Sequence, residues 1–173
     1  MPNQSRIANL SDKHCVFQCG DAIFSLPATT VREVTLLPAV VPVPLSHPAL
    51  AGIGNARSEF LPVIDLEPLV GNQAKRRLES GQLLVIESAI GCWAIAIDRV
   101  VAIDGIETHV DAGTRNENTL SLLLGTASYG GRVISVLDVN GLQRIAQQTL
   151  ENQWDRVQQD HASSVTSTEW NAV

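Results

Sequence analysis

A repeated strand-to-helix junction constrains the fold of this chain of 173 residues more than any other feature. The segment VIDLEPL, which contains Asp65, matches VLDVNGL, which contains Asp138. A glycine, Gly52 or Gly125, lies 13 residues before the aspartate of each copy. A candidate hairpin also precedes each copy, QCGDAIFSL before the first and ESAIGCWAIAI before the second. We therefore expect two related β units of about five strands each, both ending in a strand, an aspartate and a short helix.

Short runs of β-branched and aromatic residues between Gly, Pro, Asp and Asn predict that most of the chain forms strands. The runs are CVFQC, AIFSL, FLPVI, LLVIE, CWAIAI and RVISVL. In CWAIAI, large residues alternate with small ones. The large residues are Trp93, Ile95 and Ile97, and the small ones are Cys92, Ala94 and Ala96. We expect the large face in a core and the small face packed closely against another element.

Three segments lack strand patterns. Leu37 to Pro48 contains four prolines, which predicts an extended loop or an edge strand, and the polar residues 105–119 are typical of a surface loop. Helical spacing of apolar residues predicts a helix from about Asn140 to Gln158. The expected domain organisation is a disordered arm (1–13), a folded domain of two β-barrel halves (14–142), a helical continuation (143–158) and a disordered tail (159–173).

Composition narrows the class of partner. The chain is 45% hydrophobic with a net charge of −6, so it can form a core but does not favour nucleic acid, which binds through Lys and Arg. The first residues lack the apolar segment of a signal peptide, and no run is long enough to span a bilayer. Three cysteines without framework spacing favour a reducing, cytoplasmic compartment.

The sequence matches none of the common catalytic motifs. Phosphate-binding loops, GxGxxG and GxSxG are absent from the sequence. His14, Cys15 and Cys19 could form a metal cluster, but the even spacing of the two cysteines within a strand favours two thiols buried in the core. Asp65 and Asp138 fit helix N-caps better than an acid–base pair. We therefore predict no catalytic residue, no metal and no cofactor, and a protein that acts by binding.

Four blocks between Cys15 and Leu142 carry a family resemblance. They read VFQCGDAIFSLPATTVREV, HPALAGIGNARSEFLPVIDL, LLVIESAIGCWAIAIDRVVAI and LLGTASYGGRVISVLDVNGL. Their order, spacing and residue types resemble CheW, the adaptor family of bacterial chemosensory arrays. The most specific part is a Gly-x-x-Asn-x-Arg-Gly turn followed by Pro-Val-x-Asp-Leu, matched here by Gly52, Asn55, Arg57, Pro62, Val63, Asp65 and Leu66. Two positions depart from the family, because Ala56 and Ser58 stand where leucine and glycine are usual.

The resemblance implies an all-β, CheW-like fold of two SH3-like five-stranded β-barrels packed together, followed here by a C-terminal helix. It implies a non-enzymatic adaptor that couples the cytoplasmic tips of chemoreceptors to the regulatory domain of a CheA-type histidine kinase. Such a protein is cytoplasmic, works at membrane-associated receptor arrays and inserts into no membrane. Three alternatives remain open: a PilI-like adaptor of a pilus-driven twitching system, a detached regulatory domain related to CheA, and a β domain with no chemosensory partner.

The resemblance also suggests where the receptor binds. The receptor-binding residues it implies are Glu33, Val34, Gly52, Asn55 and Arg57. We expect Glu33 to hold the Arg57 guanidinium, with two charge-assisted hydrogen bonds, at the rim of an apolar groove that accepts helix side chains. The kinase is expected to bind strand edges and apolar side chains of the first barrel, for which the sequence identifies no individual residues.

Overall fold

The computed structural model describes residues 13–44, 46–70, 80–89, 91–109, 122–145 and 147. Lys13 already belongs to the first strand, and the predicted arm before it lies outside the described residues. The same holds for the predicted helix beyond residue 147, the tail (159–173) and most of the predicted loop at 105–119.

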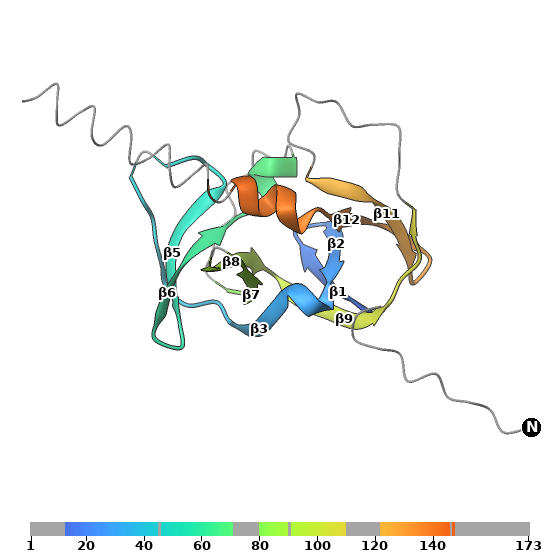
Figure 1. Ribbon diagram of the computed structural model, residues 1–173, viewed down its shortest axis with the longest axis horizontal. Coiled ribbons are helices and arrows are strands. Elements are labelled where there is room, and N and C mark those ends of the chain that lie inside the picture. Colours follow the sequence, from blue (N-terminus) through green and yellow to red (C-terminus); the bar gives the residue numbers. More distant parts are fainter. Residues whose placement is uncertain are drawn as a thin grey trace, which may run out of the picture.

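The described residues form two antiparallel-rich sheets beside one another, each of six strands (Figure 1). Sheet A has the order β10-β11-β12-β2-β1-β9, made of Thr108–His109, Leu123–Tyr129, Arg132–Leu137, Ala22–Pro27, Lys13–Cys19 and Arg99–Gly105. Sheet B has the order β3-β7-β8-β6-β5-β4, made of Val31–Leu36, Gln82–Ser88, Gly91–Ile97, Glu59–Ile64, Leu50–Ala56 and Val40–Val41. Each sheet thus has five longer strands and one of two residues. This confirms the predicted all-β fold class.

The two sheets have the same strand order but exchange their hairpins. The β1–β2 hairpin precedes the first copy of the repeated segment, yet β2 pairs in parallel with β12 of the second copy. The β7–β8 hairpin precedes the second copy, yet β8 pairs in parallel with β6 of the first. The two units are therefore intertwined in space. Sequence order alone predicts that each hairpin joins the copy that follows it, because neighbouring segments are the usual partners.

The repeated segment has the same local structure in both copies. Each strand bulges near its glycine, where φ is 149° at Gly52 and 159° at Gly125. After each strand, the amide two residues beyond the aspartate donates to its side chain, at 3.1 Å for Asp65 and 3.0 Å for Asp138. Asp65 precedes the 3-10 helix η3 (Glu67–Val70), and Asp138 precedes the helical residues 139–145. Both aspartates are thus the N-terminal caps that the sequence predicted.

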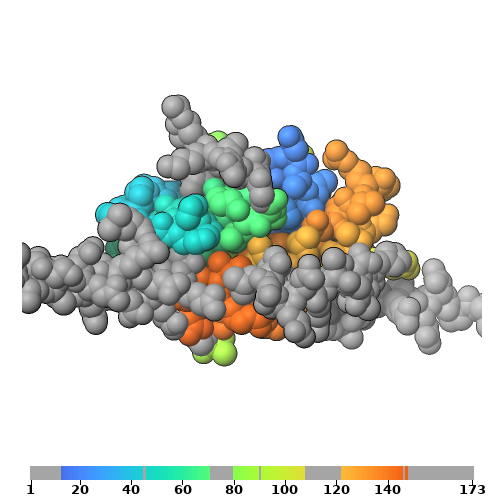
Figure 2. Space-filling view, turned by 90° about the horizontal axis from the view of Figure 1, so that it is seen from above, coloured from blue at the N-terminus to red at the C-terminus, as the bar shows by residue number. Residues whose placement is uncertain are grey.

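The largest core cluster lies between the two sheets and is shared by them. The large face of β8 (Trp93, Ile95 and Ile97) packs there with Phe17 of β1. The C-terminal helix adds Leu142 and Ile145 to this cluster, and Figures 1 and 2 show the helix (orange) beside η3 (green). Burying one such side chain contributes about 1.5–3 kcal/mol, so this shared cluster holds the sheets together.

A smaller core lies on the inner face of each sheet. The cluster of sheet B contains Ala94 and Ala96 from the small face of β8, with Leu61 and Val85. The cluster of sheet A contains Val16, Ala127, Ile134 and Val136. Both faces of β8 are therefore buried, as the alternation of large and small residues predicted. The small residues let the inner face of sheet B approach its neighbours closely.

Candidate protein-binding site

Strand β3 forms one edge of sheet B and displays alternate side chains on two faces. It pairs with β7 on one side, and no described strand pairs with its other side. Arg32, Val34 and Leu36 are exposed, whereas the side chain of Glu33 is only 11% exposed. Strand alternation thus directs Glu33 toward the interior side of the edge and Val34 toward solvent.

The turn between β5 and β6 consists of Arg57 and Ser58, both with positive φ, at 47° and 69°. A two-residue hairpin turn of the I′ kind needs this conformation and favours Asn and Gly. The amide of Ser58 donates to Oδ1 of Asn55 at 3.2 Å, which supports the turn from within the hairpin. A non-glycine residue in this region costs about 1–2 kcal/mol, so the departure from glycine at position 58 has a physical consequence.

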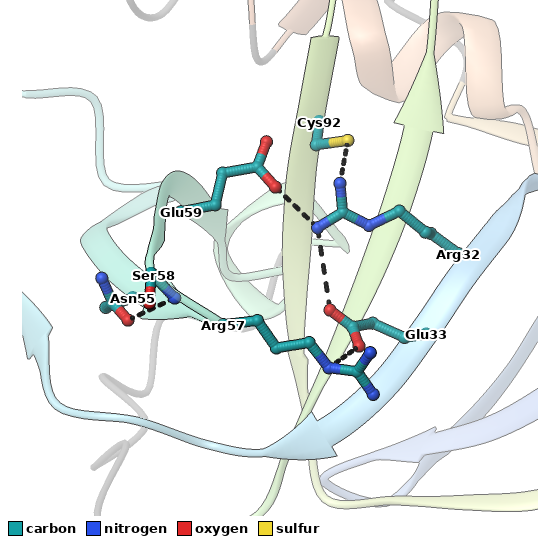
Figure 3. Close-up of polar contacts among 7 residues, drawn as sticks. All are labelled: Arg32, Glu33, Asn55, Arg57, Ser58, Glu59 and Cys92. Atoms are coloured by element: carbon teal, nitrogen blue, oxygen red, sulfur yellow. Dashed lines mark hydrogen bonds and ion pairs between the residues drawn. The ribbon is translucent and has the colours of Figure 1, made fainter.

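Four charged residues join this turn to the edge of the sheet, and we call them the clasp: Arg32, Glu33, Arg57 and Glu59 (Figure 3). Nε of Arg57 lies 2.7 Å from Oε2 of Glu33. Nη2 of Arg32 lies 2.7 Å from Oε2 of Glu59 and 3.7 Å from Oε1 of Glu33. The clasp therefore connects β3 to the β5–β6 hairpin through two reciprocal ion pairs.

The clasp shows how strongly sheet B curls. Strands β3 and β6 are three places apart in the sheet, which is roughly 14 Å in a flat sheet. Side chains from these strands nevertheless meet at ion-pair distance. Nη1 of Arg32 also donates to Sγ of Cys92 at 2.8 Å, and Cys92 packs against the inner core of sheet B. The clasp thus lies over one end of that core.

The two arginines of the clasp use their nitrogens differently. In Arg32 both Nη atoms are engaged, and the hydrogen bond with Glu59 raises the pKa of this guanidinium above its usual value. Arg57 meets Glu33 through Nε, and its side chain is 81% exposed. Among the residues that the structure describes, neither oxygen of Glu33 has a partner with hydrogen-bond geometry. The buried carboxylate is therefore balanced by the proximity of the two guanidinium groups rather than by directed hydrogen bonds.

The structure brings three of the five predicted receptor-binding residues together: Glu33, Asn55 and Arg57. The expected ion pair between Glu33 and Arg57 is present, but it is a single contact through Nε and not the two-bond fork that we expected. Val34 lies next to Glu33 with 39% of its surface exposed.

Gly52, the fifth predicted residue, is buried. A Cβ atom there would lie 2.2 Å from the backbone oxygen of Val41 in the edge strand β4. Glycine at this position therefore allows the close approach of β4 to β5. The residue supports the shape of the hairpin and offers no side-chain surface to a partner.

Sequence reasoning missed two members of the clasp, Arg32 and Glu59, and the exposed Phe60. Arg32 and Glu59 have the spacing of ordinary surface charges, so the sequence contains no signal for their pairing. Phe60 is 75% exposed, and the alternation along FLPVI offered a signal, because Leu61 faces the inner core.

The thiols lie where the sequence predicted. Cys15 and Cys19 are reduced thiols buried in the shared core, and Cys92 is a half-buried thiol; none of the three forms a disulfide with a described residue. Burial raises the pKa of the Cys15 thiol to about 11. Among the described residues, no three His, Cys, Asp or Glu side chains are arranged to hold a metal ion. None of the helices that these residues form is long and apolar enough to cross a membrane.

Comparisons with known proteins define the family to which this chain is related. A family model for the CheW-like domain matches residues 13–147. The chain is 26% identical over 134 residues to the chemotaxis protein CheW of Treponema pallidum (strain Nichols), covering 73% of this chain and 78% of that protein. The scaffolding protein TtCheW from Thermoanaerobacter tengcongensis has a similar fold, with a TM-score of 0.62 and 19% identity, covering 80% of this chain and 91% of that one.

The chain therefore belongs to the CheW-like domain family, as its sequence blocks indicated. This is a scaffolding family of chemotaxis proteins and is generally non-enzymatic. The structure agrees in its two sheets and its C-terminal helix.

Proposed function

We propose that this protein is a non-enzymatic cytoplasmic adaptor that couples the cytoplasmic tips of chemoreceptors to a CheA-type histidine kinase. Family membership supports the general role. The observation that carries the proposal for this chain is the clasp, because the family's Asn-x-Arg turn is here fixed to the edge of sheet B by Glu33. A surface fixed in this way can bind a partner without first ordering its own side chains.

The receptor would bind across β3 and the β5–β6 turn. Val34 offers an apolar contact on the exposed side of β3, and Arg57 offers a charged one where it meets Glu33, the preceding residue of that strand. Helical hairpins bind apolar surfaces through side chains that recur on one helix face, with charges at the rim that set orientation. Asn55 and the buried Gly52 contribute by holding the hairpin in shape.

The kinase needs a second surface, so that both partners can bind at once. We place it on the opposite edge of sheet B, where the two-residue strand β4 carries Val41 at 66% exposure. An exposed apolar side chain on an edge strand can pack against the sheet of a partner.

Pull-down of each partner separately tests the proposal. The wild-type chain should retain both a receptor cytoplasmic fragment and the regulatory domain of a CheA-type kinase. Val34→Lys should weaken capture of the receptor fragment and leave kinase capture unchanged, whereas Val41→Lys should do the reverse. Both positions are exposed, so neither change should disturb folding. Failure of the wild-type chain to retain either partner would contradict the proposed function.

A further inference from the structure

Two polar side chains face the interior of sheet A. Val16 belongs to the core on the inner face of this sheet, and Ser25 is its cross-strand partner in β2, so the Ser25 side chain points to the same side. His14 precedes Val16 by two residues in β1 and therefore shares that face. Ser25 is fully buried, and Nδ1 of His14 is buried although the residue as a whole is partly exposed. Sheet A thus encloses two polar atoms beside its apolar core.

Sheet B shows that the fold does not require polar groups at these positions. The two sheets have the same strand order, with β7 and β8 in the places of β1 and β2. β2 runs parallel to the repeated segment of the second copy as β8 does to that of the first, and this register makes Ala94 the counterpart of Ser25. The antiparallel register then makes Leu83 the counterpart of His14. Leu83 and Ala94 are fully buried, so an apolar interior satisfies this architecture.

The two polar atoms of sheet A lack protein partners. Neither Nδ1 of His14 nor Oγ of Ser25 has a hydrogen-bond partner among the described residues. Native proteins leave few buried polar atoms without one, because the lost hydration is costly. The two residues occupy diagonal positions of the β1–β2 ladder, a relationship that separates residues by roughly 7–8 Å. That spacing suits one small molecule held between the two side chains.

The chemistry of the two atoms selects the molecule. A serine hydroxyl both donates and accepts, and burial lowers the pKa of His14, which favours the neutral ring with one donor and one acceptor nitrogen. Neither group supplies a charge to hold an ion. Asp104, the cross-strand partner of His14 in β9, is exposed, and its Oδ1 accepts from the amide of Gly105. Water donates and accepts, and buried waters satisfy polar groups of this kind.

We propose that sheet A contains a buried hydration site, in which one ordered water molecule bridges Nδ1 of His14 and Oγ of Ser25. In sheet B the counterpart positions hold Leu83 and Ala94, whose side chains offer water no hydrogen bond. The two halves of the fold therefore have different interiors, one hydrated and one apolar. The bridge also ties β1 to β2 through side chains. The inference is independent of the adaptor role.

A crystal structure of the full chain tests the site directly. It should show a water oxygen within about 2.7–3.2 Å of both atoms. A direct hydrogen bond between His14 and Ser25, a bond of either atom to another protein group, or the absence of an ordered water between them would overturn the inference.

A double-mutant cycle tests the bridge in solution, using the residues that sheet B already carries. His14→Leu and Ser25→Ala each leave the other polar atom and the water with a missing partner, so each should lower the melting temperature. The double variant removes both polar groups and should melt above either single variant, and its crystal structure should show no water at this position. Ala94→Ser is the matched control, since it places a hydroxyl opposite an apolar partner and should lower the melting temperature. Additive losses in the double variant would contradict a shared water.

Discussion

Nε of Arg57 lies 2.7 Å from Oε2 of Glu33, and this contact joins a side chain that is 81% exposed to one that is 11% exposed. Exposed ion pairs contribute only about 0–1 kcal/mol to stability, whereas a buried charge without a partner is costly. The pair is therefore asymmetric. Glu33 depends on Arg57 for its charge balance, while Arg57 depends on Glu33 for its orientation.

This asymmetry predicts the effect of removing each partner. In Arg57→Ala, Arg32 at 3.7 Å is the one remaining cation near Glu33 in the described part of the chain, and we expect the free energy of unfolding to fall by about 1–2 kcal/mol. Arg57→Glu should lower it further, because a second carboxylate would lie beside Glu33. Urea denaturation measures both changes.

Glu33→Gln provides the control for this prediction. In the Arg57→Ala background it removes the uncompensated charge, so it should recover most of the lost stability. If the double variant is as unstable as Arg57→Ala alone, the lost ion pair is not the cause of the instability.

The strained turn predicts a stabilising change. Ser58 has φ of 69°, which glycine adopts without the cost that a side chain incurs. Part of the gain is offset because glycine also makes the unfolded chain more flexible, so Ser58→Gly should stabilise the protein by about 0.5–1 kcal/mol in urea. Ser58→Ala keeps the strain and should bring no gain. Equal stability of the glycine and alanine variants would argue against a strained turn.

Alanine substitutions at Gly52 and Gly130 distinguish the cost of a steric clash from the cost of backbone strain. A Cβ at Gly52 would lie 2.2 Å from the oxygen of Val41, whereas a Cβ at Gly130 would meet nothing within 4 Å. Gly130→Ala should therefore lower the free energy of unfolding by about 1–2 kcal/mol, because of its positive φ alone. Gly52→Ala should cost clearly more, because β4 must move as well, and thermal unfolding should rank the two variants in that order. Similar losses in both would refute the clash.

The sequence was most informative where local chemistry decides the structure. Alternation of large and small residues placed both faces of β8 correctly, and Asp65 and Asp138 were recognisable as caps from their positions after strands. The exchange of hairpins between the sheets was not predictable, because the parallel pairs β2–β12 and β6–β8 join segments far apart in the chain. Local patterns do not specify such pairings.

The candidate site was likewise predictable only in part. Glu33 and Arg57 were found through the family resemblance, and Gly52 was placed in the same site although it has a structural role. Arg32 and Glu59 were missed because their contact depends on the curl of sheet B, which brings β3 back to the hairpin. That curl is a property of the whole sheet rather than of any segment.

Burial of Cys15 predicts a loss of stability at alkaline pH. Its pKa is raised from 9.0 in the reference thiol to about 11 in the folded protein, through desolvation. Between these values the unfolded chain releases the proton and the folded chain keeps it. The stabilising contribution is therefore complete below pH 9 and is lost as pH rises toward 11, with a slope of up to about 1.4 kcal/mol per pH unit.

Cys15→Ser tests this assignment, because serine does not titrate in this range. The wild-type chain should lose more stability between pH 8.5 and about 10.5 than the variant does, measured by urea denaturation at each pH. The comparison uses slopes, so the lower starting stability of the variant does not affect it. Parallel pH profiles for the two proteins would contradict a buried, neutral thiol.

The proposed adaptor role requires that one molecule of this protein bind a receptor and a kinase together. The direct measurement immobilises a receptor cytoplasmic fragment and adds the regulatory domain of a CheA-type kinase, with and without the chain. We predict that the kinase domain is retained only when the chain is present, and that Val34→Lys reduces this retention. Equal retention of the kinase domain with and without the chain, or displacement of the chain from the receptor by the kinase domain, would contradict the adaptor role.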